Sequence, residues 1–453
     1  MTDCIRYSPR ASLSLMGLRM EQMGIWKVIA EHVNIKQKTI QHTPLDKIKD
    51  TFINIMAGGH GLVEVNTRVR PDTALSAAFG RQGCADQSTI SETLNHCTGE
   101  NVAEMRAALR QLYQRYGSGY HHQSGQEWRL LDVDMTGLPA GKQGEGSYKG
   151  YFAGRKNRRG RQLGRVVATG HDEIVVDRLY DGKTQLERSL QPLVEEAEAT
   201  LNLNAALRQR TIIRVDGGGG SDKDVNWLLN RHYRLMVKVK HWQRAGKLCR
   251  SVSAWQPDPK VPDREVGWVQ QPQAYDQPTR QLAIRVQQKN GQYTYMVLVF
   301  NLSDEMLFWL ADRPQPSKVT ATACLFAALY AYDRRSGAAE TVIKGSKQGL
   351  GLNKRNKKRF AAQEMLVLLA QLAYNLIAWT RNRLALHDQA LAHWGMLRMV
   401  RDAFHIPGCI QLDGCGRIRR VTLSQAHTLS FVFIKAFSSY LARDGTSLIW
   451  GQI

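Results

Sequence analysis

Polar and apolar residues alternate along the stretch LLDVDMTGLP, residues 130–139. Apolar side chains fall on one side of this stretch, and Asp132 and Asp134 fall on the other, which is the period of two that a β-strand imposes. The pattern predicts a short buried strand that ends in a turn and carries two carboxylates on one face. Acidic side chains on a sheet face need solvent, a cation or a chemical role, and an edge strand that faces water is the simplest alternative.

More strands and helices follow, in the order strand, strand, helix, strand, helix, strand, so that residues 126–241 are predicted to form an α/β core with a mixed sheet. Asp216 is the last residue of the fourth strand. This is the chain order of an RNase H-like domain, in which the first and fourth strands lie side by side. Such a topology would bring Asp134 and Asp216 together. Neighbouring carboxylates repel unless a cation lies between them, and oxygen ligands suit Mg²⁺ or Mn²⁺.

Residues 1–125 are predicted to be mainly helical. Two short helices, 73–79 and 87–97, flank the glycine-containing segment GRQGCAD, which gives this region the outline of a helix-turn-helix. An ordinary helical hairpin produces the same outline. In a DNA-binding helix-turn-helix, the residues presented to DNA would be Gln87, Ser88, Thr89 and Ser91.

The rest of the chain divides into three predicted segments. Residues 242–318 are rich in proline and contain two strands around an Asn-Gly turn, which indicates a β-rich insertion. Residues 319–385 return to helix as the second part of the core, with an interruption expected at Gly337 and a long apolar helix at 361–384. Residues 386–453 are predicted to form a hairpin and a closing helix.

Composition adds a partner to this picture. Lysine and arginine number 62 against 40 aspartates and glutamates, a formal charge of +22. Such an excess favours nucleic acid as partner over an anionic membrane, because no strongly amphipathic basic helix stands out. The most apolar stretch, 365–380, has 16 uncharged residues and falls short of the roughly 20 that a membrane span needs. Seven scattered cysteines and the lack of a signal-peptide pattern predict a cytoplasmic protein.

A glycine-rich basic segment, residues 146–165, has aromatic residues near its start. Its composition indicates a loop laid along DNA phosphates, with a merely solvated loop as the alternative. The cations expected to contact DNA are Arg155, Lys156, Arg158 and Arg159.

Three motifs carry a family resemblance. The first is LDVDMTGLP, with Asp134 two residues before a threonine; the second is IIRVDGGGGSD, with Asp216; and the third is YDRRSGAAETVIKGSKQGLGLN. In this order, with a β-rich insertion before the third, they resemble the DDE transposases of bacterial insertion sequences, in the group marked by a Tyr-x-x-Arg, Glu and Lys signature. The third motif supplies Tyr332, Arg335, Glu340 and Lys347. Four residues separate its arginine and glutamate, where the commonest form has three.

The resemblance implies a catalytic triad of Asp134, Asp216 and Glu340 that binds two Mg²⁺ or Mn²⁺ ions per active site. Two such ions can activate the attacking oxygen and stabilise the leaving one in phosphoryl transfer. Water and then a freed 3′-hydroxyl would be the nucleophiles. Double-stranded DNA, both inverted-repeat ends and target, would be bound by a dimer at the bacterial nucleoid. The DNA contacts expected from the third motif are Tyr332, Arg335, Lys344 and Lys347.

The sequence leaves alternatives open at three residues. Asp132 shares a face with Asp134 and could support a metal without being a ligand. Trp255 or Trp268 could stack on a displaced base, as a tryptophan of the insertion does in some relatives, or could pack in the hairpin core.

Two other functions fit the same residues. One is an RNase H-like nuclease that cleaves DNA without strand transfer, and the other is a non-catalytic DNA-binding regulator with a decayed core. The intact set of Asp134, Asp216 and Glu340 argues against decay. A transposase that binds terminal inverted repeats and both cleaves and joins DNA is the leading hypothesis.

Overall fold

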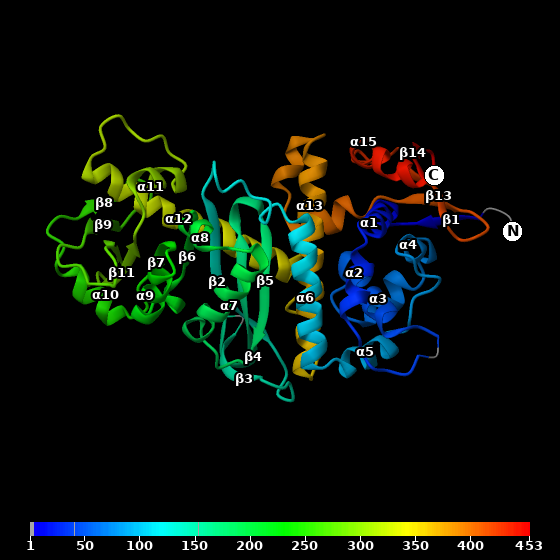
Figure 1. Cartoon of the computed structure of the whole chain (residues 1–453), viewed down its shortest axis with the longest axis horizontal. Helices are drawn as coiled ribbons and strands as arrows, with labels where there is room; N and C mark the ends of the chain where they lie inside the picture. Colours follow the sequence, from blue (N-terminus) through cyan, green and yellow to red (C-terminus); the bar gives the residue numbers. More distant parts are fainter. Residues whose placement is uncertain (1–3, 40, 153) are drawn as a thin grey trace. The chain divides into compact units, whose positions relative to one another are not determined.

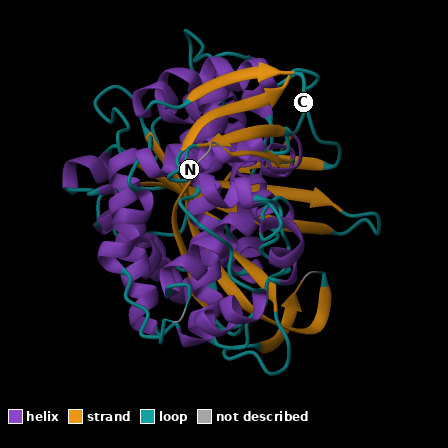
Figure 2. Cartoon of the chain, turned by 90° about the vertical axis from the view of Figure 1, so that its right-hand side faces the viewer, coloured by secondary structure: helices purple, strands orange, loops and turns teal. Residues whose placement is uncertain are grey.

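A computed structural model describes residues 4–39, 41–152 and 154–453, apart from the side chains of 336–338. The chain forms two compact units, whose elements are labelled in Figure 1. The first unit comprises Met1–Gly117, Leu138–Arg161 and Ile343–Ile453, and the second comprises Ser118–Gly137 and Gln162–Val342. Helices and strands both contribute to the fold (Figure 2), so the predicted mixed α/β class is confirmed.

The second unit is built on a mixed β-sheet. Strand β2 (Arg129–Pro139) is parallel to β6 (Thr211–Val215), which is parallel to β7 (Arg234–Lys238). On the other side of β2 lies β4 (Arg155–Ala168), which pairs antiparallel with β5 (Glu173–Tyr180). The predicted adjacency of the first and fourth core strands is therefore confirmed. Strand β2 is longer than predicted, however, because it continues through Asp134 to Pro139 instead of turning.

The strands of the predicted insertion extend this sheet. Strand β11 (Tyr293–Phe300) pairs antiparallel with β7, and β10 (Arg280–Gln287) pairs with β11 across the Asn-Gly turn. The sheet continues through β9 (Arg264–Trp268) and β8 (Gln256–Pro257). Buried apolar residues of these strands share one core with helices α11 (Asp304–Leu310) and α12 (Ala321–Gln348).

Helix α12 carries the third sequence motif. It is helical without a break through Gly337, so the interruption predicted there is wrong. A single glycine costs a helix only about 1 kcal/mol relative to alanine, which the packing of a long helix offsets. The other helices of this unit are α7 (Leu186–Leu201), α8 (Ala205–Gln209), α9 (Asp222–Asn230) and α10 (Trp242–Cys249).

The first unit is mainly helical. Its amino-terminal helices are α1 (Ala11–Gln22), α2 (Ile25–His32), α3 (Pro44–Met56), α4 (Thr73–Ala78), α5 (Gln87–His96) and α6 (Gly99–Tyr116). Helices α3, α5 and α6 pack on α13 (Phe360–Ala385), which is buried along most of its length. By length and composition α13 is apolar enough to cross a membrane, contrary to the sequence-based expectation, yet 89% of its most apolar window lies inside the structure. Because neighbouring elements cover most of its surface, α13 is the core helix of this unit.

A small sheet closes the first unit. The predicted carboxy-terminal hairpin is present as β12 (Gly408–Leu412) and β13 (Ile418–Ser424). The amino-terminal strand β1 (Cys4–Ser8) pairs with β12, and β14 (Ser447–Gly451) pairs with β13. Neither of these two strands was expected from the sequence. Short helices α14 (Met396–Arg398) and α15 (Ser430–Leu441) complete this part of the chain.

The basic segment is a β-hairpin and not the predicted loop. Strand β3 (Tyr148–Phe152) pairs antiparallel with the first half of β4, with Tyr148 opposite Gly160. Gly160 is required there, because a Cβ would meet the Phe152 ring and, at 2.7 Å, the carbonyl oxygen of Leu138. The expected DNA-contacting cations lie on strand β4: Arg155, Lys156 and Arg158 are exposed, and Arg159 is half-buried.

Candidate active site

Two aspartates emerge together from adjacent parallel strands. The register of β2 and β6 pairs Val133 with Val215. Asp134 directly follows Val133, and Asp216 directly follows Val215. Parallel neighbours lie about 4.8 Å apart, so the two carboxylates share one location on the sheet. After Asp216 the glycine run turns against β7, where a Cβ on Gly220 would overlap the Lys238 carbonyl. The glycines thus serve a tight turn beside the site.

A buried arginine supplies positive charge to this pair. The Arg335 guanidinium donates to the carbonyl oxygen of Val133 at 3.0 Å and lies 3.3 Å from Asp134 Oδ2. Burial is the main reason that the pKa of Asp134 is raised, and the nearby Asp216 charge raises it further. Arg335 and the Met135 N–H lower the pKa, but they do not outweigh burial. Asp134 is therefore a carboxylate whose negative charge is costly, and a cation beside it relieves that cost.

Asp216 is held differently. Its Oδ1 accepts hydrogen bonds from the Gly217 N–H at 2.7 Å and from the Tyr332 hydroxyl at 3.2 Å, and Lys238 Nζ lies 3.9 Å away. Burial would raise the pKa of Asp216, but these donors together with Arg335 outweigh it, so the pKa lies below its ordinary value. The site therefore places one readily ionised carboxylate beside one that resists ionisation.

Asp132 does not face an open metal position. Both of its oxygens accept from Arg214, at 2.7 and 2.8 Å, and Oδ2 also accepts from Thr169 Oγ1 at 2.7 Å. The Arg214 side chain donates in addition to the Ala331 carbonyl of α12 at 2.9 Å. Asp132 and Arg214 are both completely buried, so this pair joins sheet and helix. No sequence signal singled out Arg214, because an arginine in a strand gives no indication of its partner.

Glu340 stands apart from the two aspartates. It is exposed on α12, and among the described side chains no three of the His, Cys, Asp or Glu type gather at metal-binding spacing. Residues four positions apart lie on the same face of a helix. The face of α12 that carries Arg335 towards Asp134 therefore also carries the buried Ala339, and not Glu340. Glu340 is about 100° further round the helix. The extra residue between Arg335 and Glu340 thus has a direct geometric consequence, and the role of Glu340 stays a prediction.

The remaining predicted DNA contacts lie in the first unit. Lys344 is exposed and Lys347 is half-buried at the end of α12, both within the part of this helix that belongs to that unit. Trp255 and Trp268, the two candidates for base stacking, are both half-buried. Trp268 packs against Phe300 and donates to the Ala321 carbonyl at 3.2 Å, and Trp255 lies under the Arg285 guanidinium.

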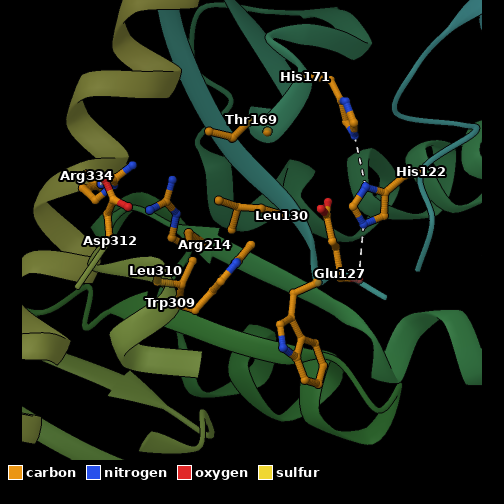
Figure 3. A pocket seen from close by; sticks show the side chains of 12 residues that line it. His122, Glu127, Leu130, Thr169, His171, Arg214, Trp309, Leu310, Asp312 and Arg334 are labelled. Carbon is orange, nitrogen blue, oxygen red and sulfur yellow. Dashed lines mark hydrogen bonds and ion pairs between the residues drawn. The ribbon is translucent and has the colours of Figure 1, made fainter. Parts of the chain in front are cut away.

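A cavity of about 430 Å³ lies in the second unit beside the Asp132–Arg214 pair, and Figure 3 shows its lining. His122 and His171 approach each other there, with Nδ1 of the first 3.1 Å from Nε2 of the second. Burial lowers the pKa of both imidazoles. Sequence reasoning did not select these residues, since isolated histidines carry no spacing signal.

The histidine pair predicts a pH dependence of stability. In the unfolded chain both imidazoles titrate near pH 6.5, whereas the folded state binds their protons only at lower pH. The free energy of unfolding is therefore expected to fall as the pH drops below about 6.5. Urea titrations at neutral and mildly acidic pH should show a smaller decline in a His122→Asn/His171→Asn variant. Replacing the exposed His393 by Asn controls for the loss of an imidazole, and an unchanged slope in the double variant would contradict the assignment.

Paired carboxylates on neighbouring parallel strands, in a strongly basic chain, are the arrangement expected of an enzyme that acts on nucleic-acid phosphates. The family comparison specifies the class: residues 6–443 match the model of the family described as transposase DDE domain, group 1. The chain belongs to this family of DDE transposases.

Two further comparisons were less informative. Among curated proteins none matches the chain. Among solved structures, the chain is similar to the piggyBac transposase in a cryo-EM synaptic complex with hairpin DNA, at 12% identity and a TM-score of 0.46. The alignment covers 97% of this chain and 82% of that one.

DDE transposases use divalent metal ions. Asp134 and Asp216 fit such an ion in kind, because carboxylate oxygens are the ligands that Mg²⁺ and Mn²⁺ prefer. The position of Arg335 beside Asp134 indicates that the site already accommodates positive charge. Of the three predicted metal ligands, the structure therefore brings two together, Asp134 and Asp216, and leaves Glu340 exposed on α12.

Proposed function

We propose that this chain binds the terminal inverted repeats of an insertion sequence and carries out metal-dependent DNA strand cleavage and strand transfer. The observation that carries the proposal is the parallel register of β2 and β6, which leaves Asp134 and Asp216 side by side. Family membership and a formal charge of +22 support DNA as the substrate. The order of β2, β6 and β7 supports an RNase H-like core that β8–β11 extend as an insertion.

The residues of the site take distinct parts in this proposal. Two Mg²⁺ or Mn²⁺ ions, held by Asp134, Asp216 and Glu340, would supply Lewis-acid stabilisation of the attacking and leaving oxygens. Tyr332 orients Asp216 through its hydroxyl, and Arg335 balances the charge of Asp134. Arg335 would also contact a phosphate oxygen of DNA bound at the site, since guanidinium groups bind phosphate in a bidentate manner.

The proposal extends to DNA contacts and assembly. Cations of β4 and of the α12 end would contact the sugar–phosphate backbone, and the helical region 1–125 would recognise the ends. A dimer on DNA would bring two ends together, on nucleoid DNA in the cytoplasm. The cations concerned are Arg155, Lys156, Arg158, Arg159, Lys344 and Lys347.

A mini-element assay tests this function. The DNA that flanks the gene supplies candidate inverted repeats, which are placed around a marker and incubated with the full chain, Mg²⁺ and a supercoiled target plasmid. The expected result is cleavage at the repeat ends and joining of the marker to the target, with a short target duplication. Cleavage without joining would instead indicate a nuclease, and binding without cleavage would indicate a regulator.

A further inference from the structure

A basic cleft of about 750 Å³ lies in the amino-terminal part of the first unit, and its lining includes residues 36–38, residues 41 and 42, Lys47 and one face of helix α5. We name it the α5 cleft. Four cationic and two acidic side chains contribute to its lining: Lys36, Lys38, Lys47, Arg70, Asp86 and Glu92.

The two acidic side chains offset only half of the four formal positive charges. Asp86 is the N-cap of α5, where it accepts from the Ser88 N–H at 2.8 Å, and it pairs with Arg70 at 3.1 Å. The backbone N–H of Ser88 contributes most to lowering the pKa of Asp86. Glu92 is exposed at the surface of α5. Lys36 and Lys38, also exposed, and Lys47 therefore leave the cleft positive.

Lys47 is the most informative residue of the α5 cleft. Its side chain is only 4% exposed, and its ammonium donates to a neutral acceptor, Gln37 Oε1, at 3.3 Å. The same oxygen already accepts from Thr93 Oγ1 at 2.6 Å. Among the described residues no carboxylate lies within ion-pair distance of Lys47. A buried ammonium without a counter-charge is costly, and an anion that enters the cleft would provide one.

The shape of the α5 cleft decides which part of DNA it fits. One face of α5, with Thr89 and Glu92, lines the cleft, whereas Ser91 on another face accepts a hydrogen bond from Lys357 Nζ at 2.6 Å. A helix that reads bases must protrude into the major groove, and a face recessed in a cleft does not. A protruding sugar–phosphate backbone fits a concave, cationic surface better.

We propose that the α5 cleft binds the sugar–phosphate backbone of DNA, with Lys36 and Lys38 on phosphate oxygens and Lys47 as the buried charge at its wall. This inference rests on the proposed function, in that DNA is taken as the substrate. It replaces the base reading predicted for α5 with backbone contact that is independent of sequence; the residues of that prediction were Gln87, Ser88, Thr89 and Ser91.

Salt-dependent binding tests the α5 cleft. Fluorescence anisotropy of the full chain with a labelled duplex of arbitrary sequence, in EDTA, gives the slope of log Kobs against log salt concentration. Each lost phosphate contact should reduce this slope by about 0.9, so Lys36→Gln/Lys38→Gln should reduce it by roughly 2 and Lys47→Met by roughly 1. Lys27→Gln/Lys289→Gln is the matched control, because it removes two exposed lysines outside the cleft.

Either of two results would contradict DNA binding by the α5 cleft. One is a wild-type slope in the Lys36→Gln/Lys38→Gln variant, and the other is an equal reduction of the slope in the control variant. Thermal melting of Lys47→Met verifies that this variant folds, and the Lys36/Lys38 variant carries the test if it does not. The proposed function is tested separately, by measuring DNA cleavage by the wild-type chain in Mg²⁺. If the wild-type chain cleaves DNA and the cleft variants keep the wild-type slope, only the proposal for the α5 cleft is refuted. A chain with the expected slopes and no cleavage refutes the transposase function alone.

Discussion

Asp134→Asn or Asp216→Asn is expected to abolish DNA strand cleavage while leaving DNA binding intact. An amide has nearly the shape of a carboxylate but lacks the charge with which Asp134 and Asp216 would hold a divalent ion. Because a metal ion supplies several kcal/mol of transition-state stabilisation, the loss should be on the order of 10³-fold or more. Single-turnover cleavage of an end fragment measures the chemistry, and a gel-shift assay of the same fragment measures binding.

A matched control for these variants is Asp312→Asn, which removes an exposed carboxylate paired with Arg334 in the same unit. It makes the same change in net charge and should cleave normally. Wild-type cleavage by Asp134→Asn or Asp216→Asn would show that the two aspartates are not metal ligands. Equal loss of binding and cleavage would show that the substitutions act on the fold instead.

Glu340→Gln is expected to cause a loss of the same order, although Glu340 lies outside the aspartate pair in this structure. If Glu340 completes the triad, the turn between Arg335 and Glu340 must accommodate one extra residue, as a π-bulge does, to bring Glu340 to the position of Ala339. Cleavage rates of Glu340→Gln and of the exposed neighbour Thr341→Val as control distinguish these cases. A Glu340→Gln variant that cuts at the wild-type rate would remove this residue from the mechanism.

The second large effect concerns stability: Asp132→Asn should lower the free energy of unfolding by about 3–5 kcal/mol. The variant leaves the buried guanidinium of Arg214 without its counter-charge, and Arg214 also anchors the Ala331 carbonyl of α12. Urea unfolding measures the difference. Arg334→Gln, which breaks the exposed pair with Asp312, should cost no more than about 1 kcal/mol. Similar losses in the two variants would contradict the structural role of Asp132.

The adjacency of Asp134 and Asp216 was predictable because it depends on strand order. A chain that alternates strands and helices over residues 126–241 has few ways to form a sheet, and helix α7 precedes β6 as a crossover. Strand periodicity placed Asp132 and Asp134 on one face, but it gave no indication of what each would meet. Both oxygens of Asp132 are taken up by the buried Arg214, whereas Asp134 lies beside Asp216 at the candidate site, a difference decided by residues about 80 positions away.

Other features could not be predicted because they depend on tertiary contacts or on helix phase. Pairing of β1 with β12 joins residues some 400 positions apart, and local pattern carries no signal for it. The basic segment 146–165 has the composition of a loop, yet its backbone is satisfied by pairing within the β3–β4 hairpin. On α12, the sequence motif identified Glu340 as a ligand, whereas the helix places Ala339 towards the site.

The most direct test of the account is cleavage of the element's own end fragment by the wild-type chain, with Mg²⁺, Ca²⁺ or EDTA in otherwise identical reactions. We expect strand cleavage at the repeat end in Mg²⁺ and none in EDTA. Ca²⁺ should support little cleavage, because its longer and more variable coordination does not hold the reacting oxygens as Mg²⁺ does. Cleavage at equal rates in Mg²⁺ and in EDTA would contradict a metal site at Asp134 and Asp216.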